Sequence, residues 1–77
     1  MSIGPVETFW TLAGEGHTAT ATIWPHPLGV ELRIMEGAEL RRTQVYRDAE
    51  DAAVDARATR SRLQMRGWKI VPVSAAP

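Results

Sequence analysis

The first part of the chain alternates between apolar and polar residues, which is the pattern of strands with one buried face. Residues 6–13 alternate in this way, with Trp10 and Leu12 on one face and Phe9 on the other. Residues 17–24 alternate more strictly, with Thr18, Thr20 and Thr22 facing away from Ala19, Ala21 and Ile23. Glycines at 14 and 16 predict a hairpin turn between the two strands, because glycine adopts positive φ without steric cost.

Two further strands are predicted at residues 28–35 and 40–46. Pro25 and Pro27 are expected to end the preceding strand, because proline cannot donate to a ladder. The alternation in residues 40–46 is broken, since Leu40 and Val45 share a face only if one extra residue is inserted. A bulge near Arg41 and Arg42 would restore the alternation, and an edge strand would tolerate the break. Either case predicts that the two adjacent arginines do not act as one site.

Residues 49–66 have the composition of a helix of about five turns, with Asp48 as the N-cap and Gly67 as the residue after the C-cap. The stripe that would face the sheet is made mostly of small residues: Ala49, Ala52, Ala56, Thr59 and Leu63. The bulk of the core must then come from the sheet, from Trp10, Ile23, Val30, Leu32 and Ile34. Residues 68–73 predict a short fifth strand, with Trp68 and Ile70 facing inward and Pro72 confining it to an edge. The predicted fold is α+β: a small antiparallel four-stranded sheet, β-β-β-β-α with this short fifth edge strand, and one helix packed across one face.

Length and composition predict one domain at residues 6–73, with flexible tails at 1–5 and 74–77. A chain of 77 residues without cysteine has a thin core and no disulfide or thiolate zinc site, which favours self-association as a source of buried area. The preference for arginine over lysine, together with many alanines, indicates a bacterial source. No apolar run is long enough to span a membrane and the N-terminus has no signal-peptide pattern, so the expected location is the cytoplasm.

The arginines raise the question of nucleic-acid binding through Arg33, Arg41 and Arg42 on the open face of the sheet, the face away from the helix. Zero net charge disfavours this reading, because phosphate neutralisation supplies most non-specific affinity. Glutamates at 31, 36 and 39 interleave with these arginines, so cross-strand ion pairs are the simpler interpretation. The helix has acids in its first half and bases in its second, which the helix macrodipole favours.

The order of basic strand, short turn and acidic, alanine-rich helix in "ELRRTQVYRDAEDAAVDA", residues 39–56, resembles the N-terminal arm-type DNA-binding domains of tyrosine-recombinase integrases. Such a resemblance implies a sheet that contacts DNA. The chain departs from that family in two ways. Those domains are basic overall, whereas this chain is neutral, and residues 6–24 contain no lysine or arginine. No functional residue is carried over from the family.

Residue patterns typical of catalysis and metal binding are missing from the sequence. His17 and His26 do not share a face, and a metal site needs three or four convergent ligands. No serine lies in a nucleophile elbow, and the glycines form no phosphate-binding loop. The sequence therefore predicts a protein that is not an enzyme and has no cofactor.

Two sets of apolar residues are candidates for contact with a protein partner. Phe9, Trp24 and Met35 would form a patch on the open face, unless the "WPHP" segment folds Trp24 over the sheet edge. Val54, Ala58 and Met65 would lie on the back of the helix, where a second copy could pack in a homodimer or where they are scattered surface residues. We expect a small bacterial protein-interaction module that self-associates, with a regulatory or nucleic-acid-binding protein as the alternative.

Overall fold

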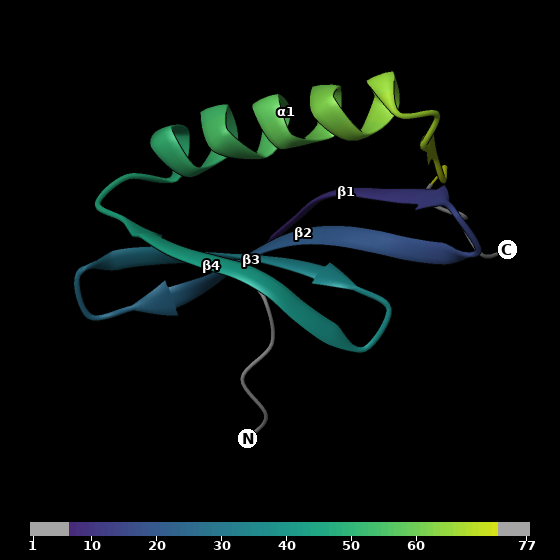
Figure 1. Ribbon diagram of the computed structural model, residues 1–77. Helices are drawn as coiled ribbons and strands as arrows, with labels where there is room; N and C mark the ends of the chain where they lie inside the picture. The colour runs from purple at the N-terminus through teal and green to yellow at the C-terminus, as the bar shows by residue number, and fades with distance from the viewer. Residues whose placement is uncertain (1–6, 73–77) are drawn as a thin grey trace, which may run out of the picture.

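The structure, a computed structural model, describes residues 7–72 of the chain. It is a five-stranded antiparallel sheet in the order β4-β3-β2-β1-β5, with one helix across one face (Figure 1). The elements are β1 (Glu7–Gly14), β2 (His17–His26), β3 (Gly29–Glu36), β4 (Glu39–Tyr46), α1 (Ala49–Met65) and β5 (Lys69–Ile70). The predicted α+β fold is confirmed, while the predicted tails and the domain limits at 6 and 73 lie outside the described residues.

Short turns connect the first four strands, as the glycine positions predict. Glu15 and Gly16, between β1 and β2, both have positive φ, at 50° and 79°. Two consecutive positive φ values match the right-handed twist of the flanking strands in a two-residue hairpin. The short connection brings β1 and β2 together as antiparallel neighbours, with Gly14 opposite His17.

Strand β2 runs through Pro25 instead of ending before it. Pro25 lies opposite Val30 of β3 and His26 lies opposite Gly29. On the other side of β2, the pairing of the described residues with β1 reaches Ile23, which lies opposite Glu7. Proline has no N–H, so Pro25 donates no hydrogen bond to a neighbouring strand.

Helix α1 begins and ends close to the predicted positions. Asp48 has an extended backbone at the N-terminus, but its side chain makes no capping hydrogen bond. At the C-terminus, Gly67 has φ 98°, and its N–H donates to the Gln64 carbonyl while the Trp68 N–H donates to the Leu63 carbonyl. This pair of bonds is a Schellman motif, which only a residue tolerant of positive φ completes without strain.

The core lies between the sheet and α1 and follows the predicted division of large and small residues. Its buried members are Trp10, Leu12, Ala19, Ala21, Ile23, Leu32, Ile34, Ala52, Ala56 and Trp68. The small helix residues let the Trp10 indole reach the helix backbone, where its N–H donates to the Ala56 carbonyl at 2.7 Å. Val30 and Leu63 are only partly buried, and Ala49 is exposed.

The fifth strand is shorter than predicted and pairs only with β1, through Leu12 opposite Ile70 and Ala13 opposite Lys69. Trp68 is buried against Gly14, where any side chain would collide with the indole ring. Ile70 lies opposite the buried Leu12 and so is on the helix-side face, as predicted, but it is 52% exposed there. Ile70 lies on the outermost strand, at the margin of the area that α1 covers, so its side chain has few neighbours.

Candidate functional site

The open face of the sheet carries a continuous set of half-exposed side chains that no described element covers. Register places Thr8, Thr22, Arg33 and Thr43 in one cross-strand row. The next row consists of Thr11, Thr20, Met35 and Leu40. Trp24, Glu31 and Val45 form a third row toward the other end of β3. The face therefore combines hydroxyl groups with a few large apolar side chains.

Trp24 lies on this open face, as one of the two sequence interpretations proposed. Its indole N–H donates to the Thr22 hydroxyl at 3.0 Å, which holds the ring along its own strand. The Arg33 guanidinium stacks over the ring, 4.3 Å from its centroid. A cation above an aromatic face gains about 0.5–1 kcal/mol at exposed sites, so this contact orients both side chains.

The charge of Arg33 is balanced within the face. Arg33 Nε donates to Glu31 Oε1 at 2.6 Å, and the Thr43 hydroxyl donates to the other Glu31 oxygen at 2.9 Å. These hydrogen bonds, with Arg33 first, lower the pKa of Glu31 below its ordinary value. The pair leaves the centre of the open face electrically neutral.

Met35 and Leu40 lie opposite each other on β3 and β4, and together they form the apolar centre of the second row. Leu40 is 51% exposed, and Met35 is half-buried. Threonines flank this pair on β2 and β1. Trp24 lies on the far side of the Arg33 row, so these three residues make an apolar surface that the Arg33–Glu31 pair interrupts and that a partner could cover. We call Trp24, Met35 and Leu40 the open-face patch.

Phe9 does not belong to the open-face patch, so its predicted placement is wrong. The register of β1 against β2 shifts between Thr8 and Trp10, which makes Phe9 the extra residue of a bulge. A bulge turns its extra residue out of the alternation. Thr8 consequently joins Thr22 on the open face, while Phe9 packs against the core. Strict alternation in residues 6–13 gave no signal for this bulge.

The predicted bulge in β4 is present, and it separates the two adjacent arginines. Ile34 lies opposite Arg42 and Met35 lies opposite Leu40, so Arg41 is the inserted residue. Arg41 binds Glu36 and Glu39 beside the β3–β4 turn, at 3.3 and 3.4 Å. The bulge that the break in alternation predicted near Arg41 and Arg42 is therefore confirmed.

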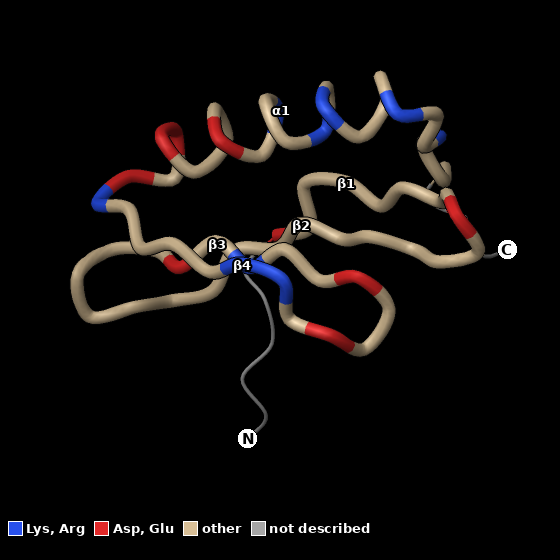
Figure 2. The backbone as a smooth tube through the Cα atoms, in the orientation of Figure 1, with Lys and Arg blue, Asp and Glu red and all other residues tan. Residues whose placement is uncertain are grey.

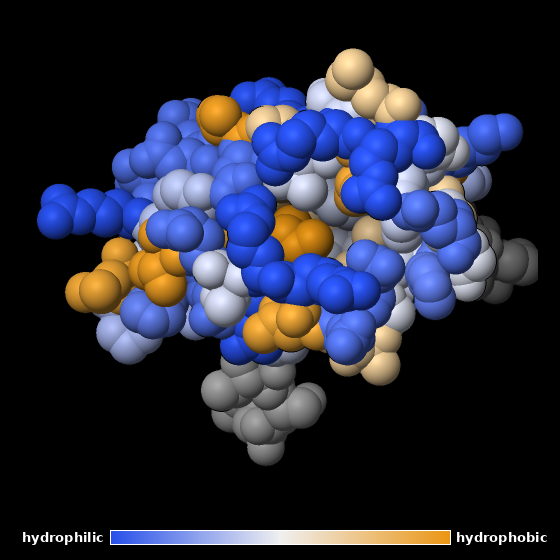
Figure 3. Space-filling view, in the orientation of Figure 1, coloured by the Kyte–Doolittle hydropathy of each residue, from blue (hydrophilic) through white to orange (hydrophobic). Residues whose placement is uncertain are grey.

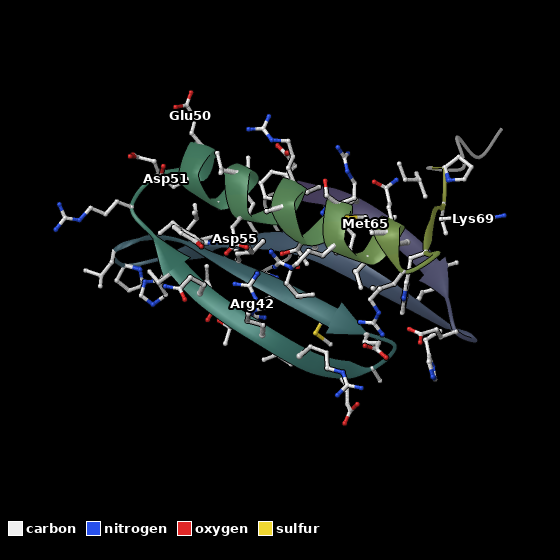
Figure 4. All side chains as sticks on the ribbon, turned by 45° about the horizontal axis from the view of Figure 1, so that its top comes forward. Arg42, Glu50, Asp51, Asp55, Met65 and Lys69 are labelled. Carbon is white, nitrogen blue, oxygen red and sulfur yellow. The ribbon has the colours of Figure 1, made fainter. Side chains whose placement is uncertain are left out.

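Arg42 faces α1, so its predicted placement on the open face is wrong. Arg42 Nη1 and Nη2 donate to the two Asp55 carboxylate oxygens at 2.8 and 2.6 Å, and Nη2 also donates to the Thr59 hydroxyl. The Tyr46 hydroxyl donates to the same carboxylate. Figure 4 shows Arg42 and Asp55 pointing toward each other between β4 and α1. We call Arg42, Tyr46, Asp55 and Thr59 the helix clamp.

The helix clamp changes the ionisation of its members. The Arg42 hydrogen bonds, and the Tyr46 hydroxyl in addition, lower the pKa of Asp55 from 3.8 to about 2 despite its partial burial. The hydrogen bond to Asp55 raises the pKa of Tyr46 above its ordinary value. Both shifts favour the pair of ionised carboxylate and neutral phenol. The break in alternation before Arg42 is the one feature of the sequence that points to the clamp.

The pKa of Asp55 predicts a loss of stability in acid. Because the folded-state pKa lies below the unfolded value, the stabilisation is complete above about pH 4–5 and disappears as the pH falls toward about 2. Asp55→Asn removes this titration. Urea unfolding at several pH values should show that the difference in free energy of unfolding between wild type and Asp55→Asn shrinks as the pH falls between these limits. A difference between the two proteins that is constant with pH would contradict the assignment.

The helix back is exposed, as predicted. Val54 and Met65 are 55% and 88% exposed, and Ala58 is exposed between them. These residues touch neither the sheet nor the open-face patch, because α1 separates them from both. The structure therefore contains two separate apolar surfaces on opposite sides of the molecule.

The histidines and acids do not converge within the described residues. His26 accepts a hydrogen bond from the Leu28 backbone N–H through Nδ1, and His17 lies opposite Gly14 at the hairpin. Among residues 7–72, no three His, Asp or Glu side chains are placed to hold a metal ion. No pocket is found on the surface that these residues form.

The fold and its surfaces define a small α+β domain with an open antiparallel sheet. The chain matches no protein-family model, no curated protein and no solved structure. In the described part of the chain, no helix is both long and apolar enough to cross a membrane. Function is therefore inferred from the surfaces of the molecule.

Proposed function

We propose that this domain is a non-enzymatic protein-interaction module that binds a protein partner through the open-face patch. The observation that carries this proposal is that the half-buried Trp24 and Met35 and the exposed Leu40 lie on a sheet face where Arg33 is already paired with Glu31. A partner that covers this face removes apolar surface from water without desolvating an unpaired charge. The partner expected from this chemistry has a largely apolar surface with groups that bond to threonine hydroxyls.

The pairing of the candidate arginines favours a protein partner over a nucleic acid. Arg33 binds Glu31, Arg41 binds Glu36 and Glu39, and Arg42 binds Asp55. Phosphate binding would have to compete with each of these carboxylates. Binding to a generic DNA duplex that weakens steeply with salt would overturn the proposal and support the nucleic-acid alternative.

Leu40→Glu tests the proposal, because it places a carboxylate within the open-face patch without touching the core. We expect it to weaken partner binding at least about tenfold, since an unpaired charge buried in an interface is costly. Candidate partners are captured from a cell extract, purified, and titrated against wild type and variant by calorimetry.

Leu28→Glu is the matched control, because Leu28 is 71% exposed in the β2–β3 turn and lies outside the patch. It should bind the purified partner as wild type does. Trp24 gives a second readout, since Trp10 and Trp68 are buried and a change in emission on binding reports mainly on Trp24. Equal affinities for wild type and Leu40→Glu would refute the role of the open face.

A further inference from the structure

The outer face of α1 has the residue pattern of a helix–helix contact. Val54, Ala58, Ser61 and Met65 are exposed and follow one another at spacings of four, three and four residues. At about 100° per residue they fall within an arc of roughly 60°, so they form one straight seam along the helix. We call these four residues the outer seam. In Figure 3, apolar atoms lie along the surface over α1 and are interrupted by hydrophilic atoms.

Charge is distributed unevenly along this helix. Glu50 and Asp51 are the acids of its first turn, and the second half carries arginines and no acid. Figure 2 shows the acidic residues at the N-terminal end of α1 and the basic residues toward its C-terminal end. Lys69 follows the C-terminal end of the helix and adds to its basic residues, whereas Glu50 and Asp51 lie at the N-terminal end (Figure 4).

We infer that the outer seam docks against the outer seam of a second copy of this chain, with the two helices antiparallel. A two-fold axis between Ala58 and Ser61 brings Val54 of each copy beside Met65 of the other. The same axis brings the acidic first turn of each helix beside the basic end of its neighbour. The surface is thus complementary to itself in shape and in charge.

The middle of the seam suits close approach. Ala58 and Ser61 are small, so two backbones can approach before side chains meet, and the larger Val54 and Met65 fill the space at either end. At about 100° per residue, Arg57 and Arg62 project from opposite sides of the outer seam. In an antiparallel pair each flank meets the same flank of the other helix, so these two arginines do not face each other.

The antiparallel direction is the one that the charges select. A parallel pair would set acid against acid and base against base along the full length of α1. Zero net charge adds no overall repulsion between copies. The contact along 17 residues is about 25 Å long. Because each copy contributes only one helix, the buried area is at the low end for stable interfaces, and the dimer is expected to be weak.

Single cysteines test both the contact and its direction, because the chain has no cysteine of its own. In the antiparallel pair, the two copies of residue 61 lie about 4 Å apart along the axis, whereas the two copies of residue 54 or of residue 65 lie about 16 Å apart. A disulfide requires Cα atoms within about 7 Å. Under mild oxidation at high protein concentration, Ser61→Cys should therefore form a covalent dimer with itself. Val54→Cys and Met65→Cys should each remain monomeric alone and crosslink to each other when mixed.

Thr18→Cys is the control for random collision, since Thr18 is exposed on the other side of the sheet and should give no dimer. All four positions are exposed, and circular dichroism checks that each variant is folded. Ala58→Cys repeats the test of Ser61→Cys on the other side of the axis.

Self-crosslinking of Val54→Cys would show a parallel pair, and the absence of a mixed Val54–Met65 product would show that the seam does not pair. Either result overturns the inference. Neither bears on the open-face proposal, which concerns a different surface.

Discussion

Gly29→Ala is expected to lower the free energy of unfolding by at least about 3 kcal/mol, through backbone strain and overpacking together. Gly29 has φ 141°, which residues with a side chain rarely adopt. A Cβ atom there would also press on the backbone at the end of β4, against the Tyr46 carbonyl oxygen and 2.6 Å from that of Arg47. Backbone atoms held in a strand end cannot move aside cheaply. Chemical denaturation followed by circular dichroism measures the loss.

Gly37→Ala separates the close approach from the positive φ. Gly37 has φ 61°, but a Cβ atom there meets nothing within 4 Å. This variant should cost about 1 kcal/mol, which is the usual penalty for an alanine in the left-handed region. Equal losses for the two variants would mean that the contact with β4 contributes nothing at Gly29.

Asp55→Ala is expected to destabilise the protein by about 2 kcal/mol, because it leaves the half-buried Arg42 guanidinium and the Tyr46 hydroxyl without their shared acceptor. The loss should appear as a lower urea midpoint with an unchanged dependence on urea. Since Arg42 remains partly solvated, the effect is expected to be smaller than that of removing one partner of a fully buried ion pair.

Asp51→Ala is the matched control, one helical turn before Asp55. Asp51 is exposed and interacts mainly with the helix dipole, so its removal should cost about 0.5 kcal/mol. Arg42→Met completes a double-mutant cycle with Asp55→Ala. If the two substitutions were additive, the helix clamp would not act as a unit.

Much of the fold could be predicted from residue spacing alone. The alternation in β2 and β3, the glycines of the first hairpin and the small residues of α1 each indicate a local structure that the tertiary fold keeps. Gly67 marks the helix end because the Schellman geometry needs positive φ. These features agree because propensity and burial favour the same conformation at each position.

The missed features are those in which one residue moves out of the alternation. The Phe9 bulge leaves no mark in an otherwise regular pattern, so Phe9 was assigned to the wrong face. In β4 the alternation is visibly broken, and a bulge was predicted there. Its consequence for Arg42, which turns toward Asp55, depends on the position of a helix that alternation alone does not specify.

The candidate surfaces were predictable to different degrees. Trp24 and Met35 follow from strand alternation, and the helix back follows from the helical period. Leu40 was not proposed, because its face depended on whether β4 contains a bulge. Pairing of the arginines was predicted as the simpler reading for Arg33 and Arg41, while the Asp55 partner of Arg42 lies 13 residues away on another element.

The hydrogen bond from the Trp10 indole to the Ala56 carbonyl, together with the helix clamp, fixes the rotation of α1 about its axis. A helix packed on a sheet through alanines alone could turn about its axis with little change in buried area. The indole holds one carbonyl toward β1, so the opposite side of the helix, with Val54, Ala58, Ser61 and Met65, is held outward. A buried residue of the sheet thus helps to determine which side chains of α1 the protein presents to a partner, although Trp10 itself lies in the core.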